Sequence, residues 1–500
     1  MTVPGEMRGE LGAMRRRAAD VGWPDAWKEN DSHRNRRGAG STAAAAAGRT
    51  SIRTRMAAPG TQRLRWSTPD LSFLVFCAAL VLSLVRAVDM PRVEVAVGST
   101  SVDVTPTDVA LVILAAVCAL RLLGRASLPQ PARAPALAAA AFSGWLLLSS
   151  ALNGVVALVA AVKLLEYGVL ALGLVLLVRR RVQLWIVVGI IGAFAVAAAT
   201  WGVLAFFGLV AADFTGRRQP SFTGEHELAL LSTLMLSVAL ASLFAPGHRL
   251  PKRVLAFAGV ISAVGVVLGA AIASLLGLYA AVAAIIVVAR PRGTATRRAL
   301  AVTAVTVALV TAGVLGLRSG DLGGFLRSLG LGEQKAQVDR NAASWNQRLV
   351  YAYIGGRIFL DSPVLGTGWH GELPPKEYVQ YLDDAHRHFP DLPPTHFPAK
   401  TGFVPQQTYD QVLYELGIVG ALLFLALGAI TLRSTMQVAR GWPRGDPDEP
   451  AAFLPAAWTA ALACALLGAA LFGGSALTAV FWLTIGLAAA APSLVPQGRP

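Results

Sequence analysis

The sequence is poor in charge and in cysteine. Only 15% of its 500 residues are charged, whereas 55% are hydrophobic, and the mean hydropathy is +0.56. A soluble domain rarely tolerates that balance, which is typical of a protein that crosses a membrane many times. The three cysteines all lie in apolar runs, and no CxxC pair is present. Neither a disulfide framework nor a cysteine-bound metal is therefore expected.

Acidic residues are scarcer than basic ones. The 29 Asp and Glu are outnumbered by 44 Lys and Arg, which gives a formal net charge of +15. The arginines stand in clusters beside apolar runs and do not form one basic face. That pattern is typical of membrane orientation and lipid headgroup contact, and it argues against nucleic-acid binding. Membrane lipids are therefore expected partners, and nucleic acid is not.

Residues 1 to about 68 differ from the remainder because they lack an apolar helical face. Arg15-Arg16-Arg17, Arg36-Arg37 and the tract Ala43 to Ala47 form a basic, low-complexity segment. Such a segment is expected to be disordered and cytoplasmic. No apolar stretch follows the arginines closely, which argues against a twin-arginine signal. A translation start at Met56 is an alternative that the sequence leaves open.

From Leu71 onward, apolar runs of spanning length follow one another. The stretch from Val254 to Ala289 is too long for one span and is divided near Gly269 to Ser274. The predicted spans are 71–88, 108–124, 134–151, 155–178, 184–210, 227–245, 254–270, 274–290, 299–317, 412–433, 453–471 and 475–495. The predicted fold is an all-α integral membrane protein with about twelve transmembrane helices.

Basic clusters fall on every second short loop, which indicates by the positive-inside rule that both termini are cytoplasmic. The one long polar stretch, 318–411, then lies outside, between the ninth and tenth spans. The chain accordingly divides into the basic segment 1–68, spans one to nine in 69–317, the large extracytoplasmic loop 318–411, and 412–500 with spans ten to twelve and a short cytoplasmic tail.

Arg217 and Arg218 lie on a short outer loop, between Thr215 and His226, and so break the positive-inside rule. Guanidinium groups at a membrane surface suit a phosphate or diphosphate, which they bind through bidentate charge-assisted hydrogen bonds. Contact with lipid headgroups or with acidic residues of the large loop is the alternative interpretation. Composition alone favours neither.

Arg348 lies in the large loop, on a predicted helix from Asn346 to Asp361 that ends at Ser362-Pro363. Arg357 follows nine positions later, so the two arginines do not share one turn. On spacing alone, an amphipathic helix on the membrane with solvated arginines is the favoured interpretation.

Histidines and carboxylates gather further along the same loop. They are His386, His388 and His396 with Asp383, Asp384 and Asp391. A His-x-His pair beside carboxylates suits a metal ion or a proton acceptor. The spacing matches no familiar metal motif, and the intervening prolines predict an irregular loop. Solvated histidines are therefore the favoured interpretation, and no metal is expected.

Lys163 and Glu166 lie three residues apart in the fourth predicted span. They share one helix face. Charged groups at that depth usually pair or line a polar cavity. A neutralised structural pair is favoured over a part in substrate or proton handling.

The order of these features resembles the O-antigen ligase family of bacterial envelope glycosyltransferases, which includes many lipid-linked polysaccharide polymerases. The shared motifs are an outer arginine followed by Pro220-Ser-Phe-Thr-Gly224, then Gln347-Arg348-Leu-Val-Tyr351, Asp361-Ser-Pro-Val-Leu-Gly-Thr-Gly368, and Leu413-Tyr-Glu-Leu-Gly-Ile-Val-Gly420. The resemblance extends over about Arg217 to Leu432, and over the earlier spans by topology alone.

The resemblance implies a membrane transferase with a GT-C-like fold at the outer face of the bacterial cytoplasmic membrane. Such enzymes pass a glycan from an undecaprenyl-diphosphate carrier to a glycan or lipid acceptor, without metal, nucleotide sugar or other cofactor. Outer-face arginines bind the donor diphosphate in this family, and Arg217 or Arg218 and Arg348 fall on those motif positions. The cations stabilise the charge that develops on the leaving diphosphate.

The sequence departs from the family pattern where the catalytic base is expected. Family ligases often carry His-Asn before the Glu-x-Gly-x-x-Gly helix, and this chain has Gln406-Gln407. Glutamine accepts no proton at neutral pH, so the role passes to another group or is lost. The resemblance leaves His396 and Glu415 as candidate catalytic residues, with Asp410 as a further option.

Two other classes of function stay open. A small-solute or bicarbonate-type transporter would use the Lys163 and Glu166 pair, although no broken span pair or inverted repeat supports it. A catalytically inactive scaffold for envelope assembly would explain Gln406.

Overall fold

The computed structural model describes residues 70–85, 90–97, 100–124, 132–210, 221–245, 250–290, 294–320, 340–371, 373–398, 407–471 and 476–495. The basic segment predicted at residues 1 to about 68 lies outside these ranges, and so do Arg217, Arg218 and Gln406. The described residues are almost entirely helical.

Each of the twelve predicted spans coincides with a helix or a helix pair. These are α2 (Leu71–Leu84), α3 (Pro106–Leu123), α4 (Arg133–Leu152), α5 (Val155–Glu166) with α6 (Gly168–Leu177), α7 (Arg181–Phe206), α8 (Glu225–Phe244), α9 (Lys252–Gly269), α10 (Ile272–Ala289), α11 (Thr294–Leu317), α15 (Thr408–Gly441), α16 (Glu449–Ala465) and α17 (Ala476–Ala490). Within the described ranges, ten segments are long and apolar enough to cross a membrane, α5 and α6 forming one of them. The chain therefore belongs to the class of all-α, multi-pass membrane proteins.

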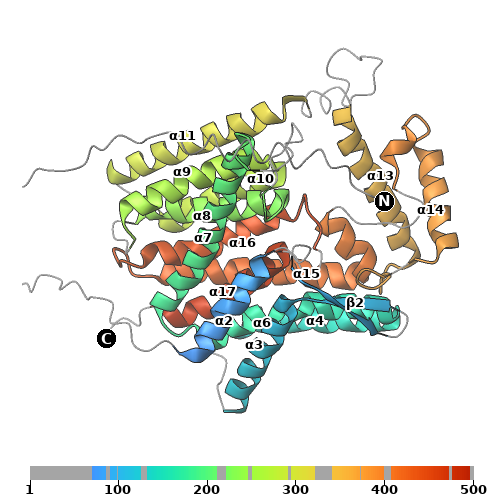
Figure 1. The fold of residues 1–500 in the computed structure, drawn as a ribbon, viewed down its shortest axis with the longest axis horizontal. Coiled ribbons are helices and arrows are strands. Elements are labelled where there is room, and N and C mark those ends of the chain that lie inside the picture. The colour runs from blue at the N-terminus through green and yellow to red at the C-terminus, as the bar shows by residue number, and fades with distance from the viewer. Residues whose placement is uncertain are drawn as a thin grey trace, which may run out of the picture. The chain divides into compact units, whose positions relative to one another are not determined.

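The helices pack around one continuous hydrophobic core to which every one of them contributes. Every residue of α17 is buried, so this helix lies inside the bundle (Figure 1). Trp482 Nε1 of α17 donates a hydrogen bond of 2.9 Å to the carbonyl of Leu164 on α5. Trp458 Nε1 of α16 similarly donates to the Leu234 carbonyl of α8, at 3.2 Å. These bonds satisfy indole donors that would otherwise be unpaired in an apolar environment.

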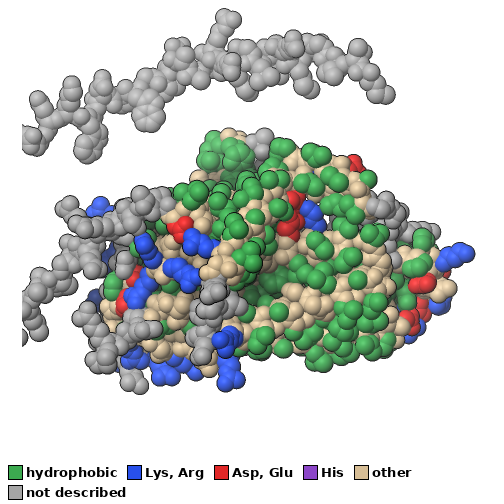
Figure 2. Space-filling view, turned by 90° about the horizontal axis from the view of Figure 1, so that it is seen from below, with side chains coloured by type: hydrophobic (Ala, Val, Ile, Leu, Met, Phe, Trp, Pro, Cys, Tyr) green, Lys and Arg blue, Asp and Glu red, His purple; other side chains and the backbone are tan. Residues whose placement is uncertain are grey.

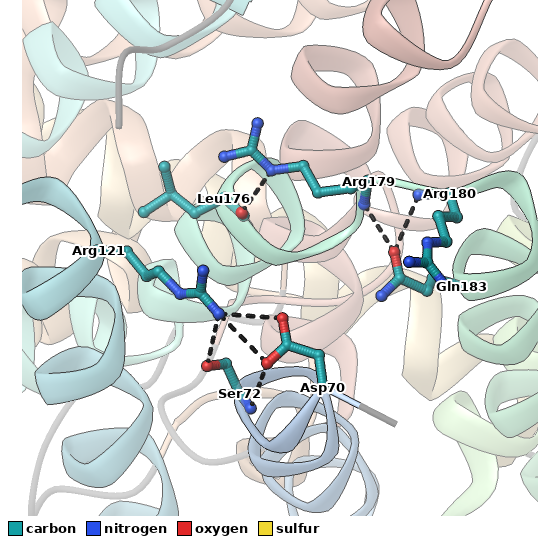
Figure 3. A network of polar contacts seen from close by, with 7 residues as sticks. All are labelled: Asp70, Ser72, Arg121, Leu176, Arg179, Arg180 and Gln183. Carbon is teal, nitrogen blue, oxygen red and sulfur yellow. Dashed lines mark hydrogen bonds and ion pairs between the residues drawn. The ribbon is translucent and has the colours of Figure 1, made fainter. Parts of the chain in front are cut away.

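One end of the bundle, here called the basic end, carries Arg121, Arg179 and Arg180. Figure 2 shows most of the visible lysine and arginine side chains over one end and a largely hydrophobic surface beside them. Arg121 Nη2, at the end of α3, lies 3.0 Å from Asp70 Oδ2 before α2 (Figure 3). Gln183 Oε1 accepts from the backbone amides of Arg179 and Arg180 at 2.8 and 2.9 Å, which caps the start of α7.

Between α9 and α10 the chain turns through Ala270, whose φ of 43° is unusual for a residue other than glycine. This confirms the predicted division of the long apolar stretch near Gly269 to Ser274. Arg318 Nη1, just after α11, donates to the Ala270 carbonyl at 3.2 Å. The two helix ends therefore meet at the second end of the bundle, here called the loop end.

The long polar stretch folds into a helical layer at the loop end. It contains α13 (Arg340–Asp361), α14 (Pro375–His388) and the short 3-10 helix η4 (Pro394–His396), with α13 and α14 side by side in Figure 1. A small core joins α13, α14, η4 and the start of α15 through Val350, Ile354, Leu382, Phe397 and Tyr414. The predicted helix ending at Asp361 is confirmed, and it begins six residues earlier than expected.

The prediction of an irregular loop around the histidines is wrong for His386 and His388, which lie in the last turn of α14. Prolines flank that helix instead of interrupting it. Pro374 and Pro375 stand at its start, where a missing N–H costs nothing. Pro390 and the later prolines follow its end.

A short antiparallel hairpin after α2 was not expected from the sequence. It pairs β1 (Val93–Val97) with β2 (Thr100–Val104), with Val95 opposite Val102. Valine at every second position is the signal that predicts such strands. It differs from the long apolar run that predicts a membrane span.

Lys163 has a partner that the sequence analysis missed. Its Nζ lies 2.7 Å from Asp108 Oδ1 on α3 and 3.5 Å from Glu166 Oε2. Asp108 also caps the start of α3 through Thr105. The cation therefore joins two helices through two carboxylates, an arrangement that favours a structural role.

Candidate functional site

Helix α15 is broken at Gly417, whose φ of 66° and ψ of −171° leave the helical region. The turn that follows α13 fills the break. The amides of Thr367 and Gly368 donate to the carbonyls of Tyr414 and Glu415 at 3.1 and 2.8 Å, and the Ile418 amide donates to the Pro363 carbonyl at 2.8 Å. The turn therefore satisfies backbone groups that the break releases, which a membrane-embedded helix requires.

Helix α4 holds the other side of this turn. Trp145 Nε1 donates to the Leu416 carbonyl at 2.9 Å, and Ser149 Oγ donates to the Leu365 carbonyl at 2.6 Å. The Trp369 amide donates to Ser150 Oγ at 3.1 Å. The turn between α13 and α14 is consequently fixed to two membrane helices, although it lies within a stretch that looks like a loop in the sequence.

The first turns of α15 are also attached to the end of α16. Thr408 Oγ1 donates to the Ala469 carbonyl at 2.7 Å. Gln411 forms two hydrogen bonds with the backbone of Leu471, one accepted by its Oε1 at 2.9 Å and one donated by its Nε2 at 3.1 Å. The start of α15 is therefore rigidly placed.

A cavity of about 280 Å³ lies where these helix ends meet. The residues lining it come from the starts of α8, α10 and α15, the ends of α11 and α16, and the middle of α13. They are His226, Ala271, Ile272, Ala273, Leu276, Arg318, Arg348, Leu349, Ala352, Gln407, Tyr409, Leu467 and Gly468. None of these lining residues is acidic.

Arg318 and Arg348 bring two cationic side chains to the wall of this cavity, and His226 lines the same wall. Arg318 is buried, with an exposed fraction of 6%, and supports the Ala270 carbonyl as well. Arg348 is close enough to Asp410 to interact with it electrostatically. Two cations in a cavity whose described lining residues include no acid form a suitable site for an anion.

The structure thus brings Arg348 together with Arg318, a residue that the sequence analysis did not single out. In the sequence, Arg318 is the first charged residue after a long apolar run, which is typical of the start of a loop. Its contact with Ala270, 48 residues away, is a tertiary feature without a local sequence signal.

Glu415 lies away from the cavity wall, in a buried polar cluster behind the break in α15. Its Oε1 is 3.6 Å from His370 Nδ1 and accepts a hydrogen bond of 3.3 Å from the Tyr414 hydroxyl. The second ring nitrogen of His370, Nε2, lies 3.5 Å from Gln411 Nε2. Burial lowers the pKa of His370 to about 4, so this ring is neutral at pH 7.

His396 is buried as well, with an exposed fraction of 1%, and its Nδ1 has no hydrogen-bond partner in the described part of the chain. Burial lowers the pKa of its ring. It does not line the cavity. The expectation of solvated histidines is therefore wrong at this position.

The three loop histidines do not converge on one point. His386 stacks on Phe397 with ring centroids 3.8 Å apart, and His388 stacks on Tyr353 at 4.5 Å. No three potential metal ligands among the described residues come together. Arg357 lies 3.2 Å from Asp384 on α14, so it belongs to the surface of the helical layer.

The low pKa of His370 predicts a loss of stability in acid. The folded state binds fewer protons than the unfolded state between the ordinary value of 6.5 and about 4, so stability falls as the pH drops through this window. At pH 5 the loss from this residue is about 2 kcal/mol relative to pH 7. In detergent, the melting temperature of the native chain should fall more steeply from pH 7 to pH 5 than that of His370→Gln.

His388→Gln serves as the control for that measurement, because His388 is exposed at the end of α14. It should keep the pH dependence of the native chain. If the melting temperature of His370→Gln depends on pH as steeply as that of the native chain, the lowered pKa of His370 is contradicted.

No protein-family model matches the sequence of the chain, and no match was found among curated proteins.

Proposed function

We propose that the chain is a membrane glycosyltransferase that transfers or polymerises a glycan from an undecaprenyl-diphosphate carrier. The observation that carries the proposal is the cavity at the loop end, which Arg318, Arg348 and His226 line and whose described lining residues include no acid. The order of motifs from Arg217 to Leu432 supports the same assignment.

The reaction needs cations at the position of the leaving group. When the bond between the sugar and the diphosphate breaks, negative charge develops on the diphosphate, and fixed guanidinium groups stabilise it. Arg318 is held in place by the Ala270 carbonyl, so little reorganisation is required as the charge develops. Arg217 and Arg218 precede the segment that leads into His226 and are further candidates for the same task.

The position of the cavity suits a lipid-linked substrate. It lies at the ends of membrane helices, where a diphosphate reaches the cations while its polyprenyl chain stays among the lipids. Arg121, Arg179 and Arg180 lie at the opposite end of the bundle, because the end of α9 packs against the end of α7 and the start of α8. By the positive-inside rule the cavity then faces the outside.

The proposed reaction also needs a general base that takes a proton from the acceptor hydroxyl. His396 and Glu415 are both buried away from the cavity wall, and their role as base stays a prediction. Asp410 follows the wall residue Tyr409 and interacts electrostatically with Arg348, which favours it as the alternative already named from the sequence.

Transfer in proteoliposomes tests the proposal. The purified chain is supplied with a polyprenyl-diphosphate-linked oligosaccharide and with either a second copy of that donor or a lipid acceptor. Products are separated by mass and by chain length. A longer or transferred glycan is the expected result. Absence of turnover with every acceptor, together with retention of the folded state, would contradict the proposal in favour of a scaffold.

A further inference from the structure

Gln407 is a buried residue on the wall of the cavity. It is 1% exposed, and neither its Nε2 nor its Oε1 has a hydrogen-bond partner in the described part of the chain. It lines the cavity that contains Arg318 and Arg348. Buried amides are normally paired, because an unsatisfied donor or acceptor lowers stability.

The unpaired side-chain amide of Gln407 plays no part in forming α15. Gln407 is the residue before the helix, with extended φ and ψ of −133° and 146°, and its side chain does not cap the helix. The backbone carbonyl of Gln407 accepts a hydrogen bond of 3.1 Å from the Gln411 amide, and this bond does not involve the Gln407 side chain. A buried amide on a cavity wall, without a hydrogen-bond partner among the described residues, is suited to a ligand.

The chemistry of the amide limits that ligand. Oε1 only accepts hydrogen bonds and Nε2 only donates them. Phosphate oxygens are acceptors, so they cannot satisfy Oε1. A ligand that reaches both the arginines and Gln407 must therefore carry a hydroxyl or N–H donor close to its anionic group. A sugar bonded to a diphosphate has this combination.

Tyr409 adds a second feature to the same wall. Its side chain lines the cavity, and it is 52% exposed. Gln407 and Tyr409 flank the first residue of α15, so both are positioned by the same rigid helix start. An aromatic ring at the rim of a pocket provides a flat apolar surface for the C–H face of a sugar ring.

We infer that Gln407 and Tyr409 form a subsite for the first sugar of the donor, next to the diphosphate site of Arg318 and Arg348. The amide binds a hydroxyl or acetamido group of that sugar, and the tyrosine ring lies against its apolar face. This inference rests on the proposed function and names which part of the substrate determines specificity.

Binding of three soluble probes tests the subsite separately from the diphosphate site. The probes are farnesyl diphosphate and its glucosyl and N-acetylglucosaminyl derivatives, titrated against the detergent-purified full chain. At least one sugar-bearing probe should bind the native chain about 10-fold or more tightly than farnesyl diphosphate. Gln407→Leu should remove this difference and leave the affinity for farnesyl diphosphate unchanged. Arg348→Ala should weaken all three probes.

Gln380→Leu is the matched control, because Gln380 is exposed on α14 and does not line the cavity. It should bind the probes as the native chain does. Thermal unfolding without ligand adds a second readout. Gln407→Leu removes an unpaired buried amide, so it should be as stable as the native chain or more stable.

The outcomes separate the subsite from the proposed function. Equal binding of all three probes by the native chain, or a loss of stability in Gln407→Leu, would overturn the sugar subsite and leave the diphosphate site standing. Failure of every probe to bind in an Arg348-dependent way would overturn the proposed function, and the subsite with it.

Discussion

Arg348→Ala is expected to reduce glycan transfer by about 10²- to 10³-fold, which is the usual cost of removing one preorganised group that stabilises developing charge. Arg348 is half-buried and lines the cavity at the loop end. Its loss removes a charge-assisted contact with the leaving diphosphate. Initial rates in proteoliposomes at saturating and at limiting donor measure the effect on kcat and on KM.

Arg357→Ala is the matched control for this variant. Arg357 lies on the same helix, nine residues later, with 48% of its side chain exposed beside Asp384. Its removal takes away the same charge from α13 without touching the cavity, so transfer should stay within about twofold of the native rate. Equal losses in both variants would indicate a general effect of charge on the helical layer and would contradict the specific role of Arg348.

Arg318 is the less informative target, although it lines the same cavity. It is buried and donates to the Ala270 carbonyl in the turn between α9 and α10. Arg318→Ala therefore removes both a cation and the support of a strained turn, and a loss of activity would not separate the two. For Arg348 the hairpin of α13 and α14 keeps its own core, which does not include the arginine.

The helices of the membrane region were predictable from the sequence because their signal is local. An apolar run long enough to span a bilayer has few alternatives to a helix, since all its backbone groups must be satisfied internally. The division between α9 and α10 was predictable for the same reason: one helix of that length would exceed the bilayer. The short hairpin was missed because its alternating valines form no apolar run.

The candidate site was only partly predictable. The motif around Arg348 pointed to one cation, but Arg318 and Gln407 meet it through the tertiary packing of α11 and α15. Asp108 and Lys163, and likewise His370 and Glu415, are pairs whose members lie more than 40 residues apart in the sequence. Such pairs depend on which helices become neighbours, and a single sequence does not contain that information.

The turn between α13 and α14 connects these observations. It is attached to α4 and to the break in α15, and the same helix start carries Gln407 and Tyr409 to the cavity. Any change that displaces this turn should therefore lower the stability of the bundle and alter the geometry of the cavity.

Gly417→Ala is expected to destabilise the protein by more than about 4 kcal/mol. Its φ of 66° with ψ of −171° is a region that only glycine occupies readily, and an added Cβ would lie 2.1 Å from the Val364 carbonyl oxygen. The contact is with backbone that three hydrogen bonds and α4 hold in place, so it cannot move aside. Thermal unfolding and the yield of monodisperse protein in detergent measure the loss.

Gly428→Ala is the control in the same helix, because an added Cβ there meets no atom within 4 Å. It should leave stability unchanged or raise it by about 0.5–1 kcal/mol through helix propensity. Gly366→Ala tests the opposite side of the contact, since its Cβ would lie 2.3 Å from the Glu415 carbonyl oxygen at a φ of 71°. Because Gly366 and Gly417 belong to one interface, the double variant should cost less than the sum of the two single losses. Native-like stability in either single variant would mean that the turn is not fixed in the break, and the rigid placement of Gln407 would then lose its basis.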